Sequence, residues 1–213
     1  MSDKKHILSR RQFAGGALAG ASLIVAGGAR AQERMALTPD QPIGPFYPVA
    51  RLAEVDADLT WLEGHSQRAS GTVIEVTGRV LDRAGRPVDG AVLELWQCNA
   101  AGRYAHPGDA ATTPLDPHFQ GYAAIRTDAG GNWKITTVKP AGYGSPIGMR
   151  TPHIHFDIRG KAHRLITQMY FPEDAATNAK DLLYKDMGGA AVRTVARADG
   201  VARYGWDIVL MEG

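Results

Sequence analysis

Two histidines lie one residue apart in the stretch RTPHIHFDI, residues 150–158. In a β-strand, side chains two residues apart point to the same face, so His153 and His155 would share one face with Asp157. The residues between them are apolar and would form an ordinary core stripe on the opposite face. A lone His-x-His pair is usually solvated on an edge strand, and only further ligands would favour a metal site.

Two tyrosines in glycine-containing loops could supply those ligands. Tyr104 follows a predicted strand end in NAAGRYAH, and Tyr143 lies in KPAGYGSPIGMR, just before the histidines. Either tyrosine alone would more often be a half-buried loop aromatic. Together with His153 and His155, however, they could bind a hard trivalent cation. Two phenolates and one hydroxide would balance the charge of Fe(III), which lowers the cost of burying that ion.

Other sites fit these residues less well. Zinc prefers cysteine, histidine or carboxylate ligands and copper electron-transfer sites use cysteine and methionine, but Cys98 is the only cysteine. A cupin-type site also uses His-x-His, but Arg159 and Gly160 occupy the place of its glutamate. Three further histidines lie in polar loops, where we expect them to be solvated: His106, His118 and His163.

The segments that must position these residues read as short strands between turns. They are TVIEVTGRVL, AVLELWQCN, YAAIR, NWKITTV, HIHFDIRG, LITQMYF and YGWDIVLM. We predict that YAAIRTDAGGNWKITTV is a hairpin around Asp-Ala-Gly-Gly. Helical periodicity is weak and confined to about residues 174–196. This spacing predicts an all-β fold, either an antiparallel β-sandwich or a barrel.

Two further units precede that fold. Residues 1–31 combine a basic start, a glycine-rich apolar run too short for a membrane span, and the small-x-small signal ARA, which is typical of a secretory signal. The pair Arg10-Arg11 makes it a twin-arginine type, so we expect export to the periplasm. Residues 32–70 contain LTPDQPIGPFYP, whose prolines predict an extended arm over the domain at residues 71–213.

Composition and charge limit the classes of function. The 213 residues suit one domain with a sizeable core. Residues 1–31 hold five of the 24 basic and one of the 22 acidic residues, so the remainder carries a net charge of −2. We therefore expect neither nucleic acid nor an anionic membrane as a partner. Cys98 has no internal disulfide partner, and we expect a buried, inert thiol.

Six ordered blocks resemble the successive signatures of the intradiol ring-cleavage dioxygenases. They are TPDQPIGPFYP, LELWQCNAAGRYAH, LDPHFQGY, RTDAGGNWKITTVKPAGY, RTPHIHFDI and RLITQMYFPED, and the resemblance runs from about residue 37 to residue 211. It implies a β-sandwich enzyme with one non-haem Fe(III) per chain. Such an enzyme uses O2 to open a catechol between its two hydroxyl-bearing carbons, giving a muconate-type diacid.

The resemblance also implies roles for individual residues. The four metal ligands would be Tyr104, Tyr143, His153 and His155, with Tyr104 equatorial and Tyr143 axial. On substrate binding Tyr143 would leave the metal and take a substrate proton. Arg150 would stabilise the negative charge that develops during the reaction, and Gln168 would be the glutamine beside the ligands.

Fewer features indicate which group of the family, defined by its substrate, the chain resembles. The short region before the first strand resembles the metal-bearing subunit of a protocatechuate 3,4-dioxygenase, and we expect a homo-oligomer or a hetero-oligomer with a related subunit. The loop GSPIGM lacks the tryptophan expected after the axial tyrosine, so catechol and bulkier phenols stay open beside protocatechuate. The alternative is an exported transthyretin-like or carbohydrate-binding β-sandwich without catalysis, which would leave the four candidate ligands without a common purpose.

Overall fold

The computed structural model describes residues 34–50 and 53–212, so the predicted signal at residues 1–31 lies outside the described residues. The strands are β1 (Val73–Asp82), β2 (Val92–Trp96), β3 (Tyr122–Arg126), β4 (Asn132–Val138), β5 (Tyr143–Ser145), β6 (Gly148–Arg150), β7 (His153–Arg159), β8 (Arg164–Tyr170), β9 (Arg197–Ala198), β10 (Arg203–Gly205) and β11 (Ile208–Leu210). Between β8 and β9 lie the short helices η1 (Pro172–Asp174), α1 (Ala175–Asn178), α2 (Leu182–Asp186) and η2 (Gly188–Thr194).

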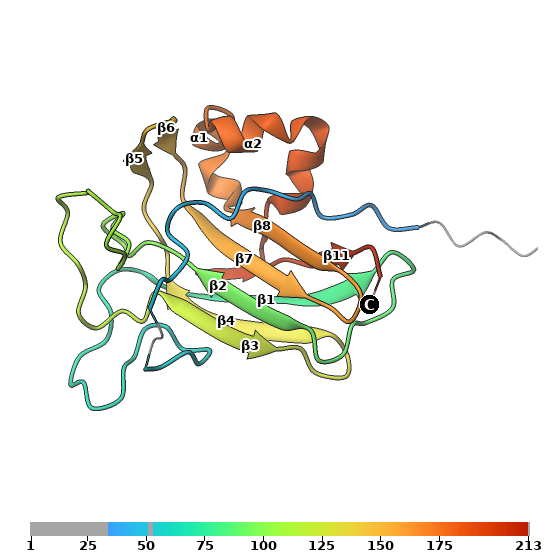
Figure 1. The fold of residues 1–213 in the computed structure, drawn as a ribbon, viewed down its shortest axis with the longest axis horizontal. Coiled ribbons are helices and arrows are strands. Elements are labelled where there is room, and N and C mark those ends of the chain that lie inside the picture. The colour runs from blue at the N-terminus through green and yellow to red at the C-terminus, as the bar shows by residue number, and fades with distance from the viewer. Residues whose placement is uncertain (1–33, 51–52, 213) are drawn as a thin grey trace, which may run out of the picture. The chain divides into compact units, whose positions relative to one another are not determined.

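Two sheets enclose one apolar core (Figure 1). The first has the order β11-β1-β10-β9, with β4 also paired to β1, and the second has the order β3-β2-β7-β8. Alternate side chains on each strand point inward, as the strand period requires. The first sheet contributes Ile74, Val76 and Ile135 to the core, and the second contributes Leu93, Leu95, Ile154, Phe156 and Ile158. The mostly β fold with antiparallel pairing is confirmed, and the two layers agree with the predicted sandwich.

The predicted hairpin at residues 122–138 is wrong. The Asp128 carboxylate accepts hydrogen bonds from the backbone of Gly130 and Asn132 and so forms the expected tight turn. However, β3 pairs with β2, whereas β4 pairs with β1 in the other sheet. A turn signal is local, but the pairing of the flanking strands depends on which sheet each strand can join to bury its apolar face.

The sheet pairing is also not wholly antiparallel. β1 pairs in parallel with β10 and β11, because the chain returns after a helical segment long enough for a crossover. The single strand expected in YGWDIVLM is split at Trp206 and Asp207. Trp206 donates its N–H to Thr77, and the Asp207 carboxylate accepts the N–H of Arg79.

The segment before β1 has little regular structure in its described part. Residues 34–50 form no helix or strand, but Thr38 and Gln41 donate backbone hydrogen bonds to Val209 and Ile166. These bonds tie the segment to β11 and β8. Residues 32–33 and 51–52 are outside the described ranges, so the arm as a whole stays a prediction. None of the helices in the described ranges has the length and apolar character needed to cross a membrane.

Candidate metal centre

β7, which carries the two histidines, lies between β2 and β8 and is therefore not an edge strand. His153 and His155 point away from the core stripe and are still only 1% and 2% exposed. Opposite His155, Trp96 of β2 stacks on its imidazole at a ring-centroid distance of 4.8 Å. The solvated-pair interpretation of His-x-His therefore does not apply.

Three of the four predicted ligand atoms converge. His153 Nε2 lies 3.1 Å from His155 Nε2, which lies 3.2 Å from the Tyr104 hydroxyl. Two atoms that both bind one metal ion at about 2.0–2.1 Å are about 2.9–3.4 Å apart. These separations therefore suit a shared ion.

Tyr143 lies at the edge of the same cluster. Its ring centroid is 5.4 Å from that of Tyr104 and 5.7 Å from that of His153. Unlike the buried Tyr104, it is half-buried, at the start of β5. The fold thus brings all four residues together, and their binding of a metal stays a prediction.

The histidines are held in the form that binds metals. His153 Nδ1 lies 2.6 Å from the carbonyl oxygen of Thr151, which can only accept, so the proton is on Nδ1 and Nε2 presents its lone pair. Burial, together with the charge of Arg150, lowers the pKa of His153 to about 3. Burial and the neighbouring His153 and Arg150 also lower the pKa of His155 well below its usual value.

The tyrosines need a cation to ionise here. Burial raises the pKa of Tyr104 well above its usual value, and burial also raises the pKa of Tyr143. A multivalent cation beside the phenols would favour their charged form. The described residues contain no cluster of three or more histidine, cysteine, aspartate or glutamate side chains placed to hold a metal, so a centre here depends on its tyrosines. That donor set suits Fe(III) and not zinc.

The loop after β2 fixes the place of Tyr104. The Asp109 carboxylate accepts the Tyr104 N–H at 2.7 Å, and Phe46 from the N-terminal segment stacks on its ring at 4.5 Å. Gly102 has φ +79°, and a Cβ there would lie only 3.0 Å from the carbonyl oxygen of Gly142. Because only glycine combines that φ with so close an approach, the loops that carry the two tyrosines can meet.

Arg150 and Gln168 also lie at the centre. Arg150 is 6% exposed and donates from Nη2 to Gln168 Oε1 at 2.5 Å. Gln168 is fully buried on β8, opposite His155, and its Nε2 has no hydrogen-bond partner within the described ranges. Arg150 is therefore a buried cation and not a surface one.

Sequence analysis missed two residues next to this pair. Asp181 is fully buried, and its Oδ2 accepts from Arg150 Nε at 2.9 Å. The only sequence signal for it is its place directly before the helical stretch LLYKD, which is typical of a helix N-cap. Gln41 of the N-terminal segment accepts the hydroxyl of Tyr170 at 2.8 Å, and nothing in the sequence indicates this contact.

A pocket of about 790 Å³ opens beside Tyr143 and Arg150. Its walls come from the N-terminal segment, the 108–111 loop, the β5–β6 hairpin and the start of α2, and they include Pro42, Phe46, Ala110, Ile147 and Leu183. Residues 144–147 of the GSPIGM loop line it. A mostly apolar pocket of this size with a few polar groups is typical of a small-molecule site.

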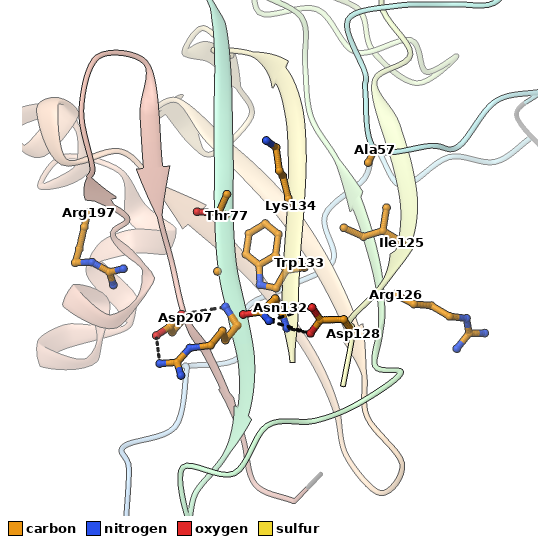
Figure 2. Close-up of a pocket in the computed structure, with 12 residues that line it drawn as sticks. Ala57, Thr77, Ile125, Arg126, Asp128, Asn132, Trp133, Lys134, Arg197 and Asp207 are labelled. Carbon is orange, nitrogen blue, oxygen red and sulfur yellow. Dashed lines mark hydrogen bonds and ion pairs between the residues drawn. The ribbon is translucent and has the colours of Figure 1, made fainter. Parts of the chain in front are cut away.

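A second pocket of about 680 Å³ lies along β1 and β4 (Figure 2). Its polar residues largely pair with each other, since Arg79 binds Asp207 and Asn132 binds Asp128. None of the predicted site residues lines it. The candidate centre is therefore not there.

The remaining histidines and the cysteine complete the comparison with the sequence. His118 was expected to be solvated, but it is half-buried and its Nδ1 lies 3.0 Å from that of His65. His106 and His163 each accept a backbone N–H, from Gly108 and Met211. Cys98 is 1% exposed, as predicted, and burial raises the pKa of its thiol to about 12.

Comparison with known proteins identifies the family. A family model described as Dioxygenase matches residues 43–212. The protocatechuate 3,4-dioxygenase beta chain of Burkholderia cepacia is 44% identical over 135 residues, and the alpha chain of Pseudomonas putida is 32% identical over 151 residues. The chain belongs to the intradiol ring-cleavage dioxygenase family.

The similarity of this intradiol dioxygenase family member to its relatives is partial. The match to the beta chain covers 61% of the chain but only 57% of that relative, and the match to the alpha chain covers 67% and 73%. The solved dioxygenase domain of a dioxygenase carbohydrate-binding protein fusion from Streptomyces sp. SirexAA-E superposes with a TM-score of 0.63 at 26% identity, over 84% of this chain and 100% of that one.

Proposed function

We propose that this chain uses O2 and one non-haem Fe(III) to open a catechol between its hydroxyl-bearing carbons, giving a muconate-type diacid. The observation that carries the proposal is the convergence of the Tyr104 hydroxyl with Nε2 of His153 and His155. The adjacent pocket and the family support it. A binding module without catalysis would leave this convergence of two neutral histidines and a tyrosine unexplained.

The four ligands would be Tyr104, Tyr143, His153 and His155. When bound, Fe(III) supplies electron withdrawal from a chelated catecholate, which prepares the ring for reaction with O2. Tyr143 is the less buried of the two phenols and lines the pocket, whereas Tyr104 does not. Tyr143 is therefore the residue that can yield its place to the substrate and accept a substrate proton as a phenolate.

Arg150 would stabilise the charge that builds up as the ring reacts. It lines the pocket and is nearly excluded from water, so its cation acts where screening is weak. The unpaired Nε2 of Gln168 offers a second donor next to it. Both groups are fixed before substrate arrives, which avoids reorganisation during the reaction.

Oxygen uptake with protocatechuate, catechol and hydroxyquinol tests this function. We expect protocatechuate to be the best substrate, because the relative at 44% identity is named for it, and catechol to be second. Product analysis should find a muconate-type diacid, and metal analysis about one iron per chain. A yellow semialdehyde would mean extradiol cleavage and would contradict the proposal. No uptake with any of the three would exclude them as substrates and leave the bulkier phenols.

Assembly is also part of the proposal. Two relatives are named as beta and alpha chains of protocatechuate 3,4-dioxygenase, and these names support a hetero-oligomer with a related subunit. A homo-oligomer is the other arrangement that we predict. Mass measurement of the purified chain, alone and with a co-expressed related chain, distinguishes the two.

We further propose that residues 1–31 form a twin-arginine signal, followed by an arm at residues 32–70 and the catalytic domain at residues 71–213. The export machinery reads the Arg10-Arg11 pair, so replacing both with lysine should leave the precursor inside the cell. Immunoblots of periplasmic and cytoplasmic fractions measure the distribution. Equal periplasmic delivery of the double variant and the wild type would rule out this route.

A further inference from the structure

The helical segment between β8 and β9 contacts Arg150 and Thr151, which lie shortly before the histidine strand β7. Figure 1 shows α1 and α2 next to the β5–β6 hairpin, at whose end Arg150 lies. Asp181, the residue before α2, contacts both Arg150 and Thr151. Thirty or more residues of sequence separate these partners, including all of β7 and β8.

The Asp181 carboxylate accepts four N–H groups. Its Oδ2 accepts from Arg150 Nε at 2.9 Å and from the backbone of Thr151 at 3.0 Å. Its Oδ1 accepts from the backbone of Leu183 at 3.0 Å and Tyr184 at 3.4 Å, which caps α2. Asp181 is fully buried, so both oxygens are committed to these partners. One side chain thus joins the start of a helix to the arginine of the pocket.

Thr151 is held from several directions at once. Its hydroxyl donates to Asn178 Oδ1 at 2.8 Å, and Asn178 Nδ2 donates to the carbonyl of Phe171, directly after β8. The carbonyl of Thr151 accepts from His153 Nδ1, the contact that fixes the imidazole tautomer. The helical segment therefore supports both the arginine and the connection to the first histidine.

The guanidinium of Arg150 is fixed by contacts at two of its edges. Nε binds Asp181 and Nη2 binds Gln168, and because the group is planar these two contacts set its plane. Side chains on either side of the pocket wall thus leave the arginine little freedom to rotate. Without Asp181, Nε of this buried cation would lose its carboxylate partner.

We propose that Asp181 is a positioning residue for ring opening, acting through Arg150 and the Thr151 peptide. The inference rests on the proposed function, because it assigns Asp181 to the reaction in which Arg150 takes part. Moving a catalytic group by about 1 Å from the reacting atoms can lower the rate about a hundredfold, whereas substrate binding depends on the whole pocket. The mark of such a role is a loss in kcat without a matching rise in KM.

Asp181→Asn is the first variant, because the amide oxygen can still cap α2 while the charge and one acceptor are lost. We expect kcat to fall by roughly tenfold to a hundredfold and KM to change by less than about threefold. Asp181→Ser, which also caps helices, is the second variant if the first folds poorly. Unchanged kcat in a folded variant would overturn the proposal.

Asp82→Asn is the matched control. Asp82 is also buried, accepts Arg86 Nε at 2.7 Å and accepts backbone N–H groups, but it is the last residue of β1 and lines no part of the pocket. We expect its kcat to equal that of the wild type. If Asp82→Asn lowers kcat as much as Asp181→Asn, the effect is one of general stability and the proposal falls.

A double-mutant cycle tests the route through Arg150. In an Arg150→Ala background, Asp181→Asn should lower kcat by less than about threefold, because Arg150 is already gone and only the contact with the Thr151 peptide is left to lose. Losses in kcat that multiply would show that Asp181 does not act through Arg150. This result would overturn the proposal that Asp181 acts through Arg150.

A measurement on iron-free protein separates this inference from the proposed function. In ¹⁵N-labelled apoprotein, the Nε–H signal of Arg150 should exchange slowly with water, and Asp181→Asn should speed its exchange by at least tenfold while Asp82→Asn leaves it unchanged. An unchanged Arg150 signal in Asp181→Asn would overturn the positioning role. If the wild-type chain opens no catechol, the proposed function fails, and the apoprotein result still decides whether Asp181 orients Arg150.

Discussion

Replacing Arg150 with alanine should lower turnover by about 10² or more, comparable to the loss of one preorganised oxyanion donor. Arg150 is buried at the wall of the pocket, and the charge it would stabilise appears only after the catecholate has bound. Only interactions that are stronger in the transition state raise the chemical rate, so substrate affinity should change little. Steady-state kinetics give kcat and KM, and the substrate-induced shift of the visible band gives binding directly.

The control for this variant is Arg164→Ala on β8. Arg164 also pairs with a buried carboxylate, Asp157, which keeps Arg159 as a second partner, and it does not line the pocket. Arg150→Ala leaves Asp181 without its cation, so thermal unfolding should be followed, with Arg150→Gln as a milder variant. A higher KM with kcat unchanged would mean that Arg150 binds substrate and transition state equally, which contradicts the assignment.

Replacing Tyr104 with phenylalanine should weaken iron binding by on the order of 10² or more and remove most of the visible absorption. The Tyr104 hydroxyl is buried 3.2 Å from His155 Nε2, so its loss would remove one of the two phenolates that would hold the ion. We expect the iron-loaded wild type to be burgundy from tyrosinate-to-Fe(III) charge transfer. Metal analysis after dialysis against a chelator and a visible spectrum measure the two effects.

Two further variants serve as comparisons for Tyr104→Phe: Tyr143→Phe, which removes the second candidate ligand, and Tyr204→Phe, which is the control. Tyr143 is half-buried at the pocket, so its variant should keep much of the iron, shift the band and slow turnover. Tyr204 is buried and its hydroxyl donates to Glu173, away from the centre, so Tyr204→Phe should keep both iron and colour. An unchanged spectrum in both Tyr104→Phe and Tyr143→Phe would show that these are not the ligands.

The residues of β7 show what a local pattern can determine. The strand period alone places His153 and His155 on one face and a core stripe on the other, because it depends only on backbone geometry. Residue types likewise determine the donor chemistry: two phenols and two imidazoles suit a hard trivalent ion, and a single cysteine cannot form a site with several thiolates. For the same local reason, most strands lie where the apolar alternation predicts them.

Pairing between distant segments was decided by the tertiary structure. The turn at Asp128 formed as predicted, but β3 and β4 joined opposite sheets, because burial of each apolar face and not the turn chose their neighbours. The register of β2 with β7 puts Trp96 opposite His155 and so delivers the next loop, with Tyr104, to the histidines. No local signal contains that register.

The sequence likewise did not determine the environment of each site residue. The resemblance implied an active-site role for Arg150, but its burial against Gln168 and Asp181 is visible only in the structure. Asp181 carried only a helix-capping signal, because its second role requires the chain to fold back across two strands. The sequence by itself therefore determined the face, the donors and the family resemblance. The tertiary structure decided how deeply each site side chain is buried, which hydrogen-bond partners it has and how it is oriented. These properties depend on contacts between segments that are far apart along the chain.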